Sequence, residues 1–350
     1  MKKTENDLII VGCGIIGLTI ATLATIRQPQ LSISLIDKGL IGTGTSSYSA
    51  GLSAPLAKTK TNYGKKLVTE SQCAMKEIEC FIDLKLHTLP AYYVVNPENA
   101  VDFQEHYVGS DLVDVDYHSL KNNCSIGNYL TVLNNKKIYF SKKTAHRTEP
   151  LKLMNQMALF LRQKSQRILE SCPIKSFKSN QKNTITLHNG MVIRGKKAIF
   201  TIGPWQSEEI QQHPNNMRVK KVAALHLASV PNKNDPAIIF FDDNAFLLPL
   251  PEQGYWLFSF TSKHWDVTPN DTLNFSKQDL ALALGVLEKY SDKLGHLFCG
   301  GRVFCDHYSP NGEIICSPLS AVSTQVMGAS GSGYRFSYAI ANQLVNDFIL

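Results

Sequence analysis

The sequence predicts an α/β protein in which two domains are interleaved along the chain. The first observation is an N-terminal strand, glycine-rich turn, helix and second strand over residues 7–37. The second is a pair of strand-rich stretches, at residues 86–144 and 216–304, that interrupt the chain. The third is the return of alternating strands and helices after each interruption. Together they predict one α/β domain built from three separated segments.

Residues 7–37 carry the glycine spacing of a Rossmann-like dinucleotide-binding unit. Gly12 permits a tight turn, Gly14 lets the backbone approach a pyrophosphate, and Gly17 lets the helix pack closely on the strand. The helix that begins here directs its free N–H groups and its positive dipole end toward phosphates. Asp37 lies 20 residues after Gly17, where a carboxylate can accept hydrogen bonds from ribose hydroxyls.

The composition indicates where the protein is located and which partners it binds. The 19 residues from Leu8 to Ile26 lack a charge and also fit a signal anchor, but the glycine spacing favours the nucleotide-binding interpretation. Eight cysteines without a regular framework favour reduced thiols. The net charge of +7 comes from dispersed lysines, which argues against nucleic-acid binding. We therefore expect a cytoplasmic protein with no membrane span and no metal site.

Periodicity and turn signals place the remaining elements. A hairpin is expected around Asn189-Gly190, because this dipeptide favours a tight turn between alternating runs. The other expected elements are a loop of small and hydroxyl residues over 42–54, a helix over 67–86, short strands within 91–140, a helix over 151–169, strands within 220–260, a helix over 276–294, and a strand, glycine loop and helix over 326–350.

Four blocks carry a resemblance to a known family: DLIIVGCGIIGLTIA, GTGTSSYSAGLSAPL, KKAIFTIGPW, and SPNGEIICSPL followed by VMGASGSGYRFSYAIANQL. With these blocks in order from Asp7 to Leu344, the chain resembles the D-amino-acid oxidase, glycine oxidase and sarcosine oxidase (DAO) family of FAD-dependent oxidoreductases. The resemblance implies oxidation of a C–N bond in an amino acid or amine by hydride transfer to flavin, often with O2 as final acceptor. It implies a substrate domain with a large antiparallel sheet. We assign residues 1–85, 145–215 and 305–350 to the FAD-binding domain, and residues 86–144 and 216–304 to the substrate domain.

The resemblance also implies which residues contact FAD. In the loop GASGSGYRF, donors at a helix N-terminus favour the negative charge of reduced flavin. Cys305 precedes the SPNG turn, as the flavin-bearing cysteine of sarcosine oxidase-like proteins does, but its spacing is one residue short, so we expect non-covalent FAD. The expected FAD contacts are Gly12, Gly14, Ile15, Ile16, Gly17, Asp37, Lys38, Thr43, Thr45, Ser46, Ser47, Ala50, Gly51, Ile174, Thr201, Gly203, Trp205, Gly328, Ser330, Gly331, Ser332, Gly333, Tyr334 and Arg335.

A carboxylate substrate requires a cation, and a guanidinium pairs with it in a bidentate manner. Arg302, in CGGRVF, lies near the position of the carboxylate-binding arginine of glycine and D-amino-acid oxidases, with about three extra residues before the next turn. Arg335 lies where sarcosine oxidase-like members carry a carboxylate-binding lysine. We expect one or both to bind the substrate.

The chain departs from the family pattern in places that affect substrate and acceptor. Ala329 and Ser330 stand within the family's GHxGxG loop, the turn reads NGEIICSP, and Phe258 aligns with the oxygen-activating lysine of sarcosine oxidase-like members. The altered turn leaves open a partner-dependent or non-catalytic flavoprotein. The net charge of +7 and the arginine–cysteine–DH run leave open an FAD oxidoreductase that modifies a tRNA base. The sequence leaves the substrate, its stereochemistry, the electron acceptor (O2 or another) and the oligomeric state undetermined.

Overall fold

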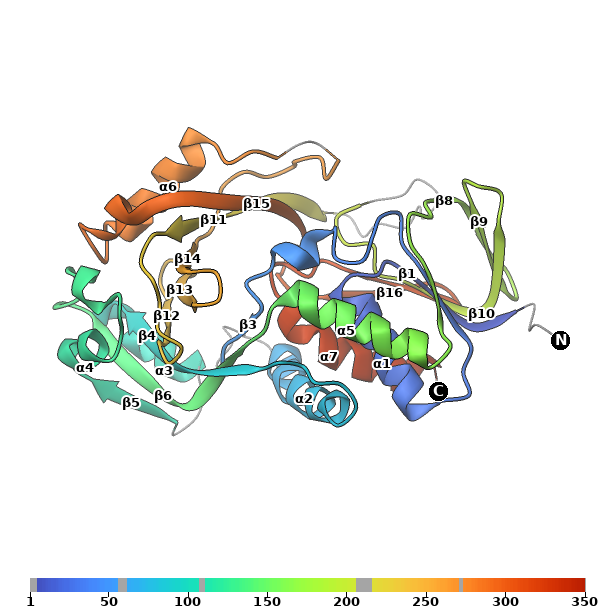
Figure 1. The fold of residues 1–350 in the computed structure, drawn as a ribbon, viewed down its shortest axis with the longest axis horizontal. Helices are drawn as coiled ribbons and strands as arrows, with labels where there is room; N and C mark the ends of the chain where they lie inside the picture. The colour runs from blue at the N-terminus through green and yellow to red at the C-terminus, as the bar shows by residue number, and fades with distance from the viewer. Residues whose placement is uncertain (1–4, 56–61, 107–110, 206–215, 271–272, 350) are drawn as a thin grey trace.

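Two β-sheets dominate the computed structural model, which describes residues 5–55, 62–106, 111–205, 216–270 and 273–349 (Figure 1). The first sheet and its helices form one half of the molecule, and both chain ends lie in that half. The second sheet and its smaller helices form the other half. The chain passes between the two halves several times, as the sequence predicts.

The first sheet is parallel through its centre. Its strand order is β16 (Ile315–Ser320), β17 (Ser323–Met327), β10 (Val192–Phe200), β1 (Asn6–Val11), β2 (Ile33–Ile36) and β7 (Arg167–Leu169), with β8 (Ile174–Ser179) and β9 (Asn183–Leu187) added as a hairpin on β10. The strands from β17 to β7 pair in parallel, whereas β16 pairs antiparallel with β17. This is the Rossmann-like arrangement that the first unit predicts.

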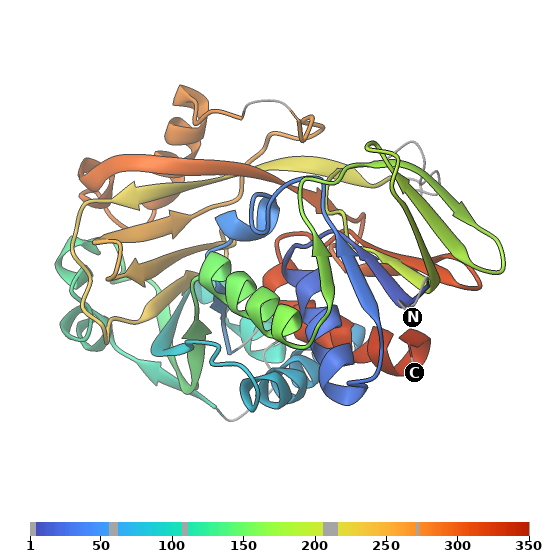
Figure 2. The ribbon, with the colours of Figure 1, turned by 45° about the vertical axis from the view of Figure 1, so that its right-hand side comes forward.

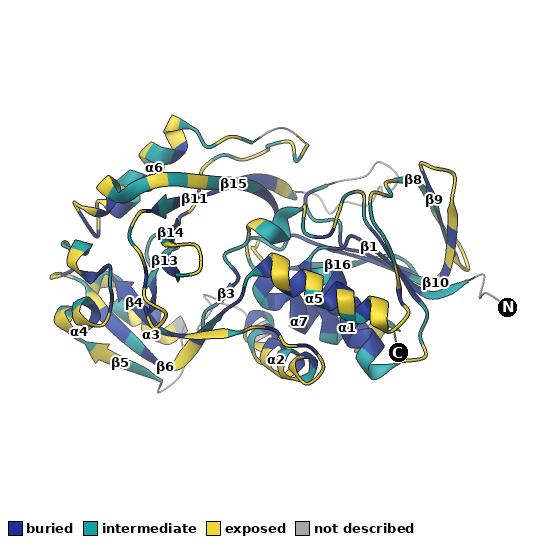
Figure 3. Cartoon of the chain, in the orientation of Figure 1, coloured by how far each residue is buried: buried dark blue, intermediate teal, exposed yellow. Residues whose placement is uncertain are grey.

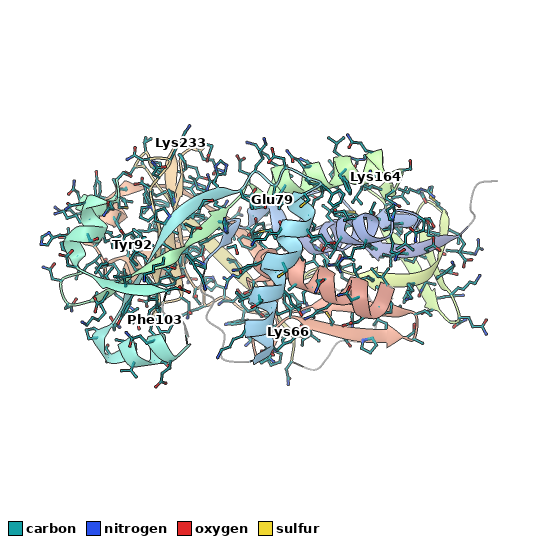
Figure 4. The ribbon with its side chains drawn as sticks, turned by 90° about the horizontal axis from the view of Figure 1, so that it is seen from below. Lys66, Glu79, Tyr92, Phe103, Lys164 and Lys233 are labelled. Atoms are coloured by element: carbon teal, nitrogen blue, oxygen red, sulfur yellow. The ribbon has the colours of Figure 1, made fainter. Side chains whose placement is uncertain are left out.

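Alternation along β1 supplies both layers that cover this sheet. Leu8 and Ile10 pack against the helices, while Ile9 and Val11 pack toward the β8–β9 hairpin, which Figure 2 shows projecting from the sheet. The inner helices are largely buried and the outer ones carry an exposed side (Figure 3). The helices are α1 (Ile15–Arg27), α2 (Asn62–Glu79), α5 (Pro150–Gln163) and α7 (Gly333–Leu344). Figure 4 shows α2, with Lys66 and Glu79 labelled, crossing the underside between the two halves.

The second sheet is mostly antiparallel. Its order is β15 (Phe298–Tyr308), β11 (Arg218–Leu227), β14 (Tyr255–Ser259), β13 (Ala245–Leu250), β12 (Ala237–Phe240), β4 (His87–Val95), β6 (Lys137–Arg147) and β3 (Leu52–Ser53), with β5 (Leu112–Val115) on β6. The expected sheet is antiparallel, and one pair of neighbouring strands differs, because β4 pairs with β12 in parallel. Its helices are α3 (Ala100–His106), α4 (Tyr117–Asn122) and α6 (Lys277–Leu287). The ion pair between Lys221 of β11 and the buried Asp279 of α6, at 2.6 Å, holds this helix against the sheet.

Short helical turns complete the fold. They are the 3-10 turns η1 (Thr45–Tyr48), η2 (Pro97–Asn99), η3 (Gly127–Tyr129) and η4 (Leu294–Leu297), and the π-turn η5 (Val345–Ile349).

One predicted turn is confirmed, and two predicted helices end earlier than expected. The Asn189-Gly190 turn is confirmed, with Gly190 in the left-handed region at φ +84°. The helix expected over 67–86 ends at Glu79, and Ile82 and Leu84 are buried from the non-helical segment that follows. The helix expected over 151–169 ends at Gln163, since residues 167–169 pair with β2 instead.

The domain boundaries stay a proposal. β3 lies in the segment assigned to FAD yet pairs with β6 of the second sheet. The strands β6 and β15 run across proposed boundaries, and residues 206–215 at the end of the second FAD segment lie outside the described residues.

Candidate active site

The glycine turn between β1 and α1 is built by close backbone contacts. Gly12 adopts φ +103°, and a Cβ there would lie 2.4 Å from the Thr201 carbonyl oxygen. A Cβ on Gly17 would lie 2.0 Å from the Gly12 carbonyl oxygen. These contacts confirm the turn and packing roles predicted for the first and third glycines. Gly14 precedes α1, and its missing Cβ faces the Ser46 hydroxyl at 3.0 Å.

Two oxygen-bearing side chains flank this turn. The Ser46 hydroxyl accepts the Ile15 N–H at 3.0 Å. Asp37 accepts the N–H groups of Cys13 at 2.6 Å and Gly39 at 2.8 Å. Burial raises the pKa of Asp37, and these two donors oppose that rise. Asp37 therefore lies at the end of β2 as the sequence predicts, held in place by the turn itself.

A cavity of about 700 Å³ extends from this turn to the face of the second sheet. It brings together residues from all four sequence blocks. The predicted site residues that line it are Gly14, Ile15, Ile16, Thr45, Ser46, Ala50, Thr201, Gly203, Arg302, Gly328, Ser330, Gly331, Ser332, Gly333, Tyr334 and Arg335.

The other predicted FAD contacts lie outside the cavity wall. Gly12, Gly17, Asp37, Lys38, Thr43, Ser47, Gly51, Ile174 and Trp205 belong to this group. The Lys38 ammonium lies 4.2 Å from the centre of the Trp205 ring, which places these two side chains together. Ile174 of β8 closely follows Cys172, whose N–H donates to the Asp37 carbonyl at 2.8 Å. The hydroxyls of Thr43 and Ser47 donate to their own loop, to the carbonyls of Leu40 and Gly44. These residues remain proposed FAD contacts.

The loop after β17 forms one end of the cavity. Gly328, Ser330 and Gly331 adopt positive φ values of 65°, 50° and 77°, so the backbone turns tightly before α7 begins at Gly333. The carboxylate of Asp306 accepts the Gly331 N–H at 2.7 Å. This hydrogen bond holds the loop against β15 just before α7 begins. The sequence predicts that the N-terminus of this helix faces the flavin.

Strands β15 and β11 supply the opposite wall. Arg302, Phe304 and Asp306 alternate along β15 and line the cavity. Their partners across the ladder are Ala224, Val222 and Lys220, which line it as well. The alternation is visible in the sequence, but the pairing that turns these residues toward the glycine turn is not.

Both predicted arginines reach this cavity. Arg302 has a buried Nε without a hydrogen-bond partner, and none of the carboxylates in the described residues forms an ion pair with it. Burial lowers the pKa of Arg302, because the charged guanidinium loses solvation there. Arg335, in the first turn of α7, also lines a second cavity of about 370 Å³ between α2, β6 and α7.

A lysine that the sequence did not single out also lies at the cavity. Lys220 is 6% exposed, and its ammonium lies 4.8 Å and 5.1 Å from the ring centres of Trp265 and Tyr308. Burial lowers the pKa of Lys220. Phe258 is fully buried in the core with Phe260, so the position expected to correspond to a lysine does not line the cavity.

Cys305 alternates with the cavity-lining residues of β15. Its side chain is buried, and burial raises the pKa of the thiol to about 11. The Thr45 hydroxyl donates to the Cys305 carbonyl at 2.8 Å, which joins the hydroxyl-rich loop to β15. A thiol with a raised pKa forms little thiolate at neutral pH and is a weak nucleophile.

Comparison with known proteins decides the family. The sequence matches the DAO family, described as FAD dependent oxidoreductase, over residues 7–346. The chain belongs to this family. A search of curated proteins found no significant match.

Solved structures of similar fold cover almost the whole DAO-family chain. L-proline dehydrogenase from P. horikoshii has a TM-score of 0.82 at 14% identity, covering 98% of this chain and 92% of that one. Glycine oxidase from Geobacillus kaustophilus has a TM-score of 0.79 at 14% identity, with 99% and 96% covered. Iminodiacetate oxidase from Chelativorans sp. BNC1 has a TM-score of 0.77 at 14% identity, with 97% and 94% covered. At this identity the likeness concerns the fold.

The residues present fit the FAD of the DAO family. The helix N-terminus at Ile15 opens into the same cavity as the loop 328–333 and the second sheet. The tight contacts at Gly12 and Gly17 hold the turn in the form that admits a pyrophosphate. None of the helices in the described ranges has the length and hydropathy of a membrane span.

Proposed function

We propose that this DAO-family protein oxidises the C–N bond of an amino acid or amine. Bound FAD would supply the chemistry by accepting a hydride from the carbon next to nitrogen. The neutral amine loses this hydride and a proton to become an imine, which water hydrolyses to a carbonyl compound and to ammonia or an amine. The protein has three tasks in this reaction, which are to orient the substrate, to exclude water and to stabilise the charge that develops.

The observation that supports an acidic substrate is the half-buried guanidinium of Arg302 in the cavity wall, which none of the described carboxylates pairs with. A partly desolvated charge without a counter-charge is destabilising. A substrate carboxylate would remove this penalty and would form two parallel hydrogen bonds with the planar guanidinium. Arg335 lines the same cavity from the first turn of α7 and is the second residue that we propose to contact the substrate.

Apolar side chains from the second sheet support the exclusion of water. Phe246 and Leu257 line the cavity opposite the glycine turn. A low-dielectric wall strengthens the charged contacts that a substrate makes at Arg302. At the other end of the cavity, α7 begins at Gly333, and the positive end of its helix dipole would favour developing negative charge.

Anaerobic flavin reduction tests this proposal. The purified holoprotein is mixed with a panel of amino acids and carboxylate-free amines, and bleaching of the flavin absorbance is followed. We expect bleaching by at least one amine-containing compound. If no compound with a C–N bond reduces the flavin, while dithionite does, the proposed reaction is wrong. Subsequent exposure to air measures whether O2 is the acceptor.

A matched pair of arginine variants tests the recognition step. Arg302→Met keeps much of the side-chain volume but removes the charge, whereas Arg194→Met makes the same change on the exposed surface of β10. We expect the first to weaken reduction by acidic substrates and the second to leave it at the wild-type rate. Equal rates for both variants would exclude Arg302 from substrate binding.

A further inference from the structure

Asp306 is a buried carboxylate at the cavity wall. It is 7% exposed and belongs to the residues that line the cavity. Its two oxygens accept the N–H groups of Gly331 at 2.7 Å and His307 at 2.8 Å. Among the described residues, no lysine, arginine or histidine forms an ion pair with it. The carboxylate thus has hydrogen bonds but no counter-charge.

The nearest cation in the ladder is directed elsewhere. Lys220 is the partner of Asp306 across the β11–β15 pair. Its ammonium lies over the Trp265 and Tyr308 rings, and burial lowers its pKa. A buried carboxylate without a counter-charge is destabilising, so a cation that enters the cavity would be stabilised beside it.

Asp306 and Arg302 share one face of β15. They are four residues apart, and the pairing of β15 with β11 runs without a shift from Tyr308 to Gly300. Four residues of extended strand span roughly 13 Å. The cavity therefore presents an anion beside the flavin loop and a cation well along the strand, with Phe304 between them.

We propose that Asp306 binds the amino group of the substrate as an ammonium, and that Arg302 binds a carboxylate at the far end of the same molecule. The substrate class is then an amino acid in which a chain of methylene groups separates the amine from the carboxylate. An α-amino acid carries the two groups on one carbon, so it does not match the spacing of these two strand positions. This inference rests on the proposed amine oxidation and names the substrate class for it. Binding is the only step that it assigns to Asp306, and the ammonium releases a proton to solvent before the hydride leaves the adjacent carbon.

A length series on the wild-type holoprotein tests the spacing. Binding of glycine, β-alanine, γ-aminobutyrate, δ-aminovalerate and ε-aminocaproate is measured anaerobically by titration calorimetry. We expect affinity to rise with chain length, by tenfold or more from glycine to the longest member. Equal or tighter binding of glycine would overturn the proposal, and this measurement needs no variant.

Charge variants test the two ends separately. We expect Asp306→Asn to weaken binding of ε-aminocaproate and of pentylamine by about ten- to a hundredfold, and to spare hexanoate. We expect Arg302→Met to weaken ε-aminocaproate and hexanoate, and to spare pentylamine. The exposed Asp116→Asn, in which the asparagine still caps α4, is the matched control. Unchanged binding in Asp306→Asn would reject the role of Asp306.

The binding and reduction experiments can reject the inference about Asp306 and the proposed oxidation independently of each other. If the compounds bind as expected but none reduces the flavin, the proposed oxidation is wrong and the recognition of both charges stands. If α-amino acids reduce the flavin faster than the long amino acids do, the oxidation stands and the inference about Asp306 is wrong.

Discussion

The Ser46 hydroxyl accepts the Ile15 N–H at 3.0 Å, so a side-chain oxygen occupies the helix N-terminus that the glycine turn exposes. This is the position at which a phosphate oxygen would accept the same N–H group. A Cβ on Gly14 would lie 3.0 Å from that hydroxyl. The glycine turn and the hydroxyl loop thus form one site, although they are about 30 residues apart.

We expect Gly14→Val to fold but to lose FAD. A side chain at this position displaces the flexible Ser46 side chain and fills the space before α1. Gly17→Val should instead lower the yield of folded protein, because its Cβ would lie 2.0 Å from a backbone oxygen that cannot move away. Circular dichroism and the ratio of flavin to protein absorbance distinguish the two results. A yellow Gly14→Val protein with one FAD per chain would contradict the proposed pyrophosphate site.

We expect the flavin to be released by acid precipitation. The Cys305 thiol is buried and its pKa is raised to about 11, so little thiolate is present to form a thioether. The absorbance of the supernatant at flavin wavelengths measures the release. Colour that stays in the pellet of the wild type and is lost in Cys305→Ser would show a covalent bond.

The sequence predicts the local parts of this site well. The turn at Gly12, the carboxylate of Asp37 and the loop at Gly331 depend on short-range spacing, and each lies where the spacing places it. The end of the helix before β7 is not predicted correctly from the sequence. Ser165 adopts φ 60°, and the segment after it pairs with β2 instead of continuing the helix. That pairing joins residues more than 130 positions apart.

The far wall of the cavity could not be predicted from local pattern. Asp306 and Lys220 face the cavity because β15 and β11 pair in one register, with Asp306 opposite Lys220. A shift of β15 by one residue would turn Cys305 inward in place of Asp306. The sequence RVFCDHY shows that Arg302, Phe304 and Asp306 share one face of a strand, but it does not say which face lies toward the site.

We expect Arg302→Ala to lower kcat/KM for an acidic substrate by roughly a hundredfold or more, since a desolvated, charge-assisted contact contributes a few kcal/mol. Arg302→Lys should restore only part of this loss, because an ammonium cannot form the two parallel bonds of a guanidinium. Stopped-flow reduction of the flavin measures both. If both variants and Arg335→Ala react at the wild-type rate, the substrate is not recognised through a carboxylate.

We expect Asp306 to destabilise the apoprotein at neutral pH. Burial raises its pKa to about 6 from the ordinary 3.8, so the folded state binds a proton more tightly than the unfolded chain does. The free energy of unfolding therefore falls as pH rises from about 4 to about 6, by roughly 3 kcal/mol for this group. The N–H groups of Gly331 and His307 oppose this rise in the pKa of Asp306. Tyr308 and Lys220 are the other titratable groups beside this carboxylate.

Urea unfolding of Asp306→Asn beside the wild type measures this effect. The stability of the variant relative to the wild type should increase between pH 4 and pH 7.5, because asparagine does not ionise. Comparing the two proteins at each pH cancels the other titrating groups. A constant difference across this range would show that the Asp306 carboxyl titrates normally.

We expect Lys221→Met to destabilise the protein by about 3–5 kcal/mol, because it leaves the buried Asp279 without its cation. Adding Asp279→Asn to this variant should recover part of the loss, since the uncompensated charge is then removed. Thermal unfolding of the wild type and the two variants measures the order of their stabilities. A double variant less stable than Lys221→Met would show that Asp279 acts mainly through its cap of α6.

The interleaved path of the chain limits how this protein can be divided. The strands of the first sheet come from three stretches, which end with β2, β10 and β17, and the second sheet takes the chain between them. No single cleavage point separates one sheet from the other, so neither half can be produced as a contiguous fragment. Both ends of the chain lie in the first half (Figure 1). A tag or fusion partner attached to either end would thus sit far from the second sheet.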